Sequence, residues 1–195
     1  MQKDSGRERL EPQDREEWRA WLEDNHHVST GVSLVTRKKN SPGKGVSYEE
    51  AIEEAIAFGW IDSRANKLNE TSYLQVYTSR KPGSVWSKTN KARVARLTEQ
   101  GRMAPSGVEK IQAAKRDGSW NRLDRVEAGR IPADLRLAMR ADPNAVKNFK
   151  ALPVSVKKQV IFWVESARRP DTRETRIMKV VEAALAGHGP WDDRA

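Results

Sequence analysis

Cysteine is absent from the 195 residues of this chain. This absence excludes disulfides, thiolate metal sites and a cysteine nucleophile, and it favours a reducing compartment. The three histidines, His26, His27 and His188, do not occur at a spacing that would direct two ligands to one metal ion. We therefore expect neither a metal nor a cofactor.

Long apolar runs are also missing. No window approaches the roughly 20 apolar residues that a membrane-spanning helix needs. The charged segment 1–12 lacks the apolar centre of a signal peptide. The sequence therefore predicts no membrane span and a cytoplasmic location.

Familiar catalytic motifs are not found either. The chain has no Gly-x-Ser-x-Gly nucleophile motif and no Gly-x-x-x-x-Gly-Lys-Ser phosphate loop. Glu49, Glu50, Glu53 and Glu54 fall on the polar face of a predicted helix, where we expect them to face solvent. A binding protein is thus favoured over an enzyme, and a small-molecule enzyme that uses Asp62 remains an alternative.

Positive charge is what the chain has in excess. The formal net charge is +9, and residues 60–130 carry 15 Lys and Arg against seven Asp and Glu. Within residues 78–102 there are seven cations and the single acid Glu99. A surplus of this kind favours anionic partners.

The periodicity of the apolar residues predicts an α+β fold. Alternation predicts strands near residues 31–39, 60–65 and 71–79. Between the first two lies a helix at 48–58, which begins at a capping box formed by Ser47 and Glu50. We expect a small mixed or antiparallel sheet with packing helices, followed by an all-helical C-terminal module.

The same patterns suggest domain boundaries. The polar segment 1–11 is expected to be disordered. An α+β domain then spans residues 12–130, with a loop at 118–129 anchored by Trp120, and a helical module spans 131–187. Residues 188–195 are predicted to be a tail.

A candidate ligand site lies at the two ends of the predicted strand pair. Trp60 and Trp86 would supply a flat apolar wall, Asp62 and Asn90 would orient a ligand, and nearby cations would bind an anionic group. The candidate ligand-binding residues are Trp60, Asp62, Arg80, Lys81, Ser84, Trp86, Ser87, Lys88, Asn90 and Arg102. An anionic small molecule is the expected partner, and a protein partner remains open.

Nucleic acid is an alternative partner. The cations Lys88, Lys91, Arg93, Arg96 and Arg102 could follow a phosphate backbone, with the rings of Trp86 and Tyr77 stacking on bases. No motif of a known nucleic-acid module occurs. This hypothesis predicts binding that weakens steeply with salt.

Several long runs resemble the YdeI/OmpD-associated family. They are EAIAFGWIDS at 54–63, SRKPGSVWSKTN at 79–90 and GRMAPSG at 101–107. The segment ARRPDTR at 167–173, followed by Arg176 and Ile177, is similar to the OmdA module of that family, which carries a bacteriocin-protection label. The resemblance extends from about residue 18 to residue 187.

This resemblance implies a non-enzymatic accessory role in envelope stress or in resistance to cationic antimicrobial agents. Relatives often carry cysteine at the position of Ala57, so any role of that cysteine is lost here. Relatives are sometimes described as periplasmic, whereas the charged N-terminal segment predicts no export signal for this chain.

Overall fold

The computed structural model describes residues 7–192. The chain divides into two compact units, residues 1–121 and 122–195, a division that falls before the predicted boundary at residue 130. Of the predicted disordered segment 1–11, residues 1–6 lie outside the described range, and Arg9–Leu10 instead form a short strand, β1. Among the described residues, no helix combines the length and the apolar character needed to cross a membrane.

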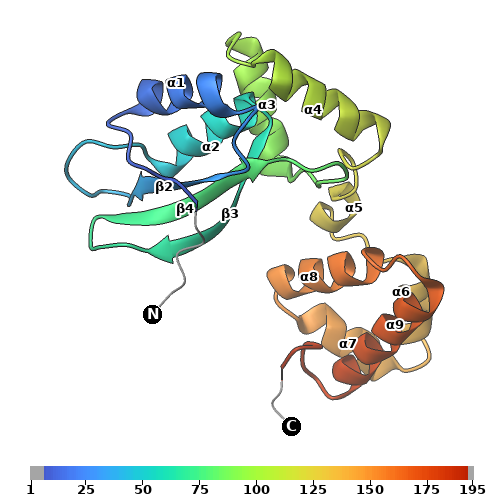
Figure 1. Cartoon of the computed structure of the whole chain (residues 1–195). Coiled ribbons are helices and arrows are strands. Elements are labelled where there is room, and N and C mark those ends of the chain that lie inside the picture. Colours follow the sequence, from blue (N-terminus) through green and yellow to red (C-terminus); the bar gives the residue numbers. More distant parts are fainter. Residues whose placement is uncertain (1–6, 193–195) are drawn as a thin grey trace. The chain divides into compact units, whose positions relative to one another are not determined.

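The first unit is built on a four-stranded mixed sheet in the order β1-β2-β4-β3 (Figure 1). Strand β2 (Val32–Arg37) pairs parallel with β1 and antiparallel with β4 (Ser72–Ser79). Strand β3 (Trp60–Lys67) completes an antiparallel hairpin with β4. The three predicted strands and the α+β class are therefore confirmed.

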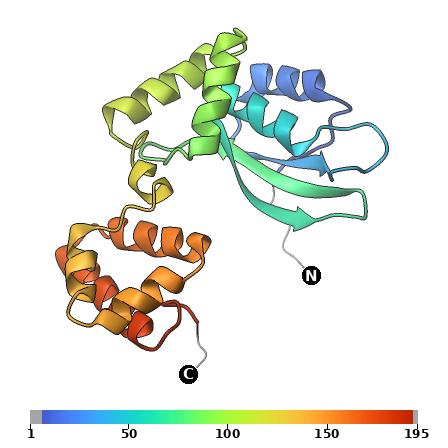
Figure 2. The same ribbon diagram turned by 180° about the vertical axis from the view of Figure 1, so that it is seen from behind.

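Helices α1 (Arg15–Asn25) and α2 (Tyr48–Ala57) lie on one face of this sheet, as both views show (Figures 1 and 2). The predicted capping box begins α2: the Ser47 hydroxyl accepts from the Glu50 amide, and the Glu50 carboxylate accepts from the Ser47 amide. Helices α3 (Lys88–Glu99) and α4 (Pro105–Arg116) follow the hairpin.

The prediction that the α2 glutamates face solvent was wrong for two of them. Glu53 is 7% exposed and Glu54 is fully buried, because α1 and α3 both pack against α2 and cover its polar face. Buried carboxylates need counter-charges. Glu54 accepts from Arg15 at 2.5 Å and from Arg19 and Arg102 at 2.8 Å each.

The second unit is helical within its described part, as predicted. A one-turn helix, α5 (Asp124–Glu127), lies within the segment expected to be a loop. It is followed by α6 (Ala133–Met139), α7 (Pro143–Ala151), α8 (Val154–Glu165) and α9 (Pro170–Leu185). Leu135, Phe149, Val160 and Val180 are among the residues of its core. In the predicted tail, Trp191 packs edge-on against Trp163, and residues 193–195 lie outside the described range.

Candidate functional site: a cavity around a buried arginine

The site begins with a tight turn directly after β4. The Ser84 amide donates to the Lys81 carbonyl at 3.1 Å. Pro82 and Gly83 occupy the two central positions, and Gly83 has a φ of 75°. Proline followed by a residue with positive φ is typical of a type II turn, in which glycine is favoured at the second central position. The turn folds the chain after β4 back toward α4.

Arg80 precedes this turn, and its side chain points into the protein. The residue is only 3% exposed. Its Nη1 donates to the Val85 carbonyl at 3.2 Å, whereas Nε and Nη2 are buried and have no hydrogen-bond partner among the described residues. Burial lowers the pKa of Arg80 to about 10, and the negative charge of Asp62 partly opposes this shift. The guanidinium is therefore a buried cation with two unused donors.

The face of the guanidinium is held by an aromatic stack. The Cζ of Arg80 lies 3.6 Å from the ring centroid of Trp86, a cation–π contact. Trp86 in turn packs against Trp120, with centroids 5.1 Å apart, and the ammonium groups of Lys91 and Lys115 each lie 5.4 Å from the Trp120 centroid. Trp86 is 1% exposed, and its ring packs directly on the Arg80 guanidinium.

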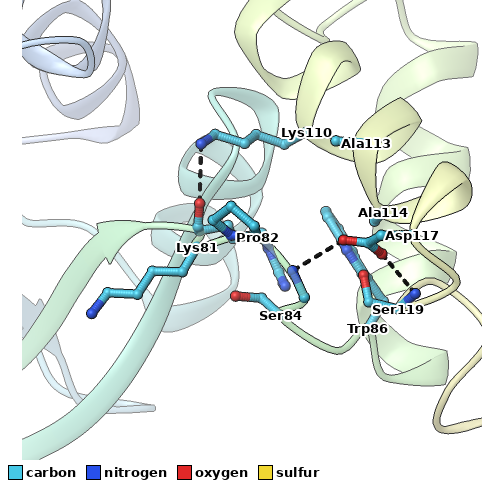
Figure 3. A pocket seen from close by; sticks show the side chains of 11 residues that line it. Lys81, Pro82, Ser84, Trp86, Lys110, Ala113, Ala114, Asp117 and Ser119 are labelled. Carbon is cyan, nitrogen blue, oxygen red and sulfur yellow. Dashed lines mark hydrogen bonds between the residues drawn. The ribbon is translucent and has the colours of Figure 1, made fainter.

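The opposite wall comes from the end of α4 (Figure 3). The Asp117 carboxylate accepts from the Gly83 amide at 3.1 Å and from the Ser119 amide at 2.8 Å, so it joins the turn to the helix end. Ser119 is fully buried, and its hydroxyl has no hydrogen-bond partner among the described residues. Lys110 donates to the Arg80 carbonyl at 3.0 Å.

These groups surround a cavity of about 100 Å³. Its lining contains three cations, Arg80, Lys81 and Lys110, and one carboxylate, that of Asp117. The excess of positive charge and the unused donors of Arg80 and Ser119 favour a ligand that accepts hydrogen bonds and carries negative charge. We refer to this space as the Arg80 cavity.

Two larger hollows differ from the Arg80 cavity in the polar atoms of their lining residues. A groove of about 460 Å³ is lined by residues that include Arg19, His26 and Phe58, and a hollow of about 240 Å³ in the second unit is lined by residues that include Phe149 and Ile161. Among the described residues, none of the buried side-chain atoms that lack a hydrogen-bond partner belongs to a lining residue of either hollow. The Arg80 cavity is therefore the stronger candidate.

Four of the predicted site residues, Arg80, Lys81, Ser84 and Trp86, line this cavity. Trp60 does not, and its expected role as a ligand-facing wall was wrong. It is fully buried in the core, where its indole donates to the His26 carbonyl at 3.3 Å and contacts Trp21 edge-on. An alternating strand pattern cannot tell a tryptophan that faces a ligand from one that faces a helix.

Asp62 also lies outside the cavity lining. Its carboxylate accepts from the Tyr48 hydroxyl at 3.1 Å. Burial, together with the charge of Asp62, raises the pKa of Tyr48 to about 12. This carboxylate therefore binds a neutral phenol, and it affects the cavity through its charge on Arg80.

The remaining predicted site residues have structural partners or face solvent. Ser87 caps α3 by accepting from the Asn90 amide, and the Asn90 side chain accepts from Arg93. Lys88 is exposed. Arg102 binds the carboxylates of Glu54 and Glu16.

The cations proposed to follow a phosphate backbone are largely paired with acids. Arg93 binds Glu49 through two hydrogen bonds, of 3.0 and 2.6 Å, and Arg96 binds Glu49 and Glu53. The two proposed stacking rings, Trp86 and Tyr77, are both buried. The structure therefore offers no support for a phosphate-tracking groove along this segment.

Sequence reasoning missed Lys110, Asp117 and Ser119. The run Asp117-Gly118-Ser119 reads as an ordinary helix end, and Gly118 has a φ of 77°. No local pattern indicates that this turn meets the one at residues 81–84, because the contact joins distant segments. Within residues 7–192, no cluster of three or more His, Asp or Glu side chains could hold a metal ion.

Family models match two parts of this sequence. A family model described as a domain of unknown function, DUF8412, matches residues 10–110. The model OmdA, described as bacteriocin-protection, YdeI or OmpD-associated, matches residues 129–187. The YdeI/OmpD-associated resemblance is thus confirmed for the C-terminal part only, since a different model covers the front of the chain. Neither the curated proteins nor the solved structures gave a match.

Proposed function

Because this chain belongs to the DUF8412 family of domains of unknown function and ends in an OmdA-type module, we propose that it is a YdeI/OmpD-associated accessory protein that binds a small anionic ligand. The proposed site is the Arg80 cavity in the first unit. The proposed role is that of a binding protein.

The buried guanidinium of Arg80 carries this proposal. A cation removed from water is costly unless anions or hydrogen-bond acceptors replace the lost solvation. Among the described residues, the guanidinium of Arg80 makes one hydrogen bond, to the Val85 carbonyl, and it contacts the Trp86 ring. An anion in the cavity would satisfy the two remaining nitrogens.

The surroundings of Arg80 also support the binding of an anion in this cavity. The Asp117 carboxylate accepts hydrogen bonds from two backbone amides, those of Gly83 and Ser119, so it stabilises the cavity wall. Lys81 is exposed beside the turn, where it can attract an approaching anion. The fixed turn and the aromatic stack hold these groups in place before a ligand arrives, which reduces the ordering cost of binding.

The test is a thermal-shift titration with small anions, monitored by tryptophan fluorescence, since Trp86 contacts Arg80. A ligand at 100 times its Kd should stabilise the native protein by about 2.7 kcal/mol. Arg80→Gln should abolish the shift. Arg64→Gln removes the same charge from an exposed position on β3 and should preserve it. Equal shifts in both variants, or no shift in the unaltered protein, would reject the proposal.

A further inference from the structure

The unused nitrogens of Arg80 lie on one edge of its guanidinium. The Nη1 group binds the Val85 carbonyl, and the face of the group contacts the Trp86 ring. The free donors are Nε and Nη2. In a planar guanidinium, the Nε–H and one N–H of Nη2 point in parallel directions from the same edge, and this pair matches two oxygens bonded to one atom.

We propose that the Arg80 cavity recognises a single oxyacid group, a carboxylate or a phosphate monoester. This inference rests on the proposed function and adds the chemical class of the ligand. Two oxygens of the group accept parallel hydrogen bonds from Nε and Nη2 of Arg80. The Ser119 hydroxyl, which is buried without a partner, donates a further hydrogen bond.

The size of the cavity limits what enters it. About 100 Å³ holds only a few water-sized groups. The acid group therefore occupies the cavity, and the rest of the ligand remains outside. Trp86 is excluded as a stacking platform for the ligand, because Arg80 covers one part of its ring system and Trp120 packs against it.

The charges of the lining fit such a group. Asp117 also lines the cavity, but each of its oxygens accepts from a backbone amide, and three cations outnumber it. Lys81 extends away from Trp86 and Asp117 (Figure 3). It is therefore placed to meet the part of the ligand that remains outside the cavity.

Isothermal titration calorimetry distinguishes a carboxylate site, a phosphate site and a site for any anion. The titrants are sodium acetate, methyl phosphate and sodium chloride, in dilute Tris chloride buffer. We expect saturable 1:1 binding of acetate or methyl phosphate, and the stronger of the two identifies the acid. Chloride should not compete at equal concentration. Arg80→Lys keeps the charge but loses the paired donors, and should weaken binding at least about tenfold.

Ser119→Ala should weaken binding roughly three- to tenfold, because one hydrogen bond is lost. Circular dichroism verifies that each variant is folded. In the unaltered protein, the ¹H–¹⁵N signal of the Arg80 Nε–H should move on addition of the bound acid, a direct readout that does not depend on any variant.

Chloride that binds as tightly as the oxyacids, with the same dependence on Arg80, would leave anion binding intact and overturn the oxyacid inference. Equal affinity in Arg80→Lys and in the unaltered protein would also overturn it, and an unchanged affinity in Ser119→Ala would remove Ser119 from the site. If no anion binds to the unaltered protein, the proposed function itself fails.

Discussion

Substitution of Glu54 by glutamine tests whether the first unit depends on a buried ion-pair network. The Glu54 carboxylate is fully buried and accepts from Arg15, Arg19 and Arg102. Glutamine has nearly the same shape but no charge. The three arginines would therefore lose their shared counter-charge. In addition, the glutamine NH₂ group would place a hydrogen-bond donor against the guanidinium donors.

The expected loss is about 3–5 kcal/mol, the range found when one partner of a buried ion pair is removed. For a unit of about this size, such a loss lowers Tm by roughly 10–20 °C. Urea unfolding monitored by tryptophan fluorescence can measure the effect, since five of the seven tryptophans lie in residues 1–121.

Glu49→Gln is the matched control. Glu49 lies on the same helix and also binds two arginines, Arg93 and Arg96, but its side chain is 52% exposed. Solvent screens such a pair, so its loss should cost about 1 kcal/mol or less. The reasoning is refuted if Glu54→Gln costs under about 1 kcal/mol, or no more than Glu49→Gln.

Three further predictions concern single sites. Gly107→Ala should lower the free energy of unfolding in urea by about 2–4 kcal/mol, because the added Cβ would lie 2.1 Å from the Ala57 carbonyl oxygen. Gly118→Ala is the control: its Cβ would meet open space and only its positive φ is strained, so the loss should be about 1 kcal/mol. Similar losses in the two variants would contradict the predicted clash at Gly107. Arg80→Met should leave the free energy of unfolding unchanged or raise it by up to about 2 kcal/mol, since burial disfavours the charged form of Arg80. The same variant should no longer bind anions. A loss of stability above about 1 kcal/mol would show that the cation stabilises the fold. Arg173 holds the pKa of Asp134 below its ordinary value. The ion pair of Asp134 with Arg173 therefore stabilises the fold above about pH 4, and this stabilisation disappears as pH falls through the lowered pKa of Asp134. In thermal scans, Asp134→Asn and the unaltered protein should differ in stability by about 0.5 kcal/mol at neutral pH, and the difference should vanish in acid. A constant difference down to pH 3 would exclude this linkage.

Local patterns in the sequence predicted most of the helices and strands. The capping box at Ser47 and the alternation in residues 71–79 act within a few residues, so they are visible without tertiary contacts. The strand β1 was not visible, because two residues form no pattern of their own and pair only through β2.

Part of the candidate site could also be predicted. The run from Arg80 to Trp86 combines cations, a turn and a tryptophan, and it lines the cavity together with α4. The role assigned to Trp60 was wrong because composition does not report burial. Lys110 and Ser119 could not be found, since helix α4 and the turn after it meet residues 80–83 only through contacts between segments that are distant in the sequence.

The sequence by itself determined the α+β class, the main helices and strands, and the excess of positive charge in residues 60–130, because these depend on composition and short-range periodicity. Only the tertiary structure decided which charges remain in water. Packing of α1 and α3 over α2 buried Glu54, and its counter-charges come from Arg15 and Arg19 of α1 and from Arg102, which follows α3. The return of the chain after β4 buried Arg80 with two free donors, and the energetic cost of that burial is what points to a ligand.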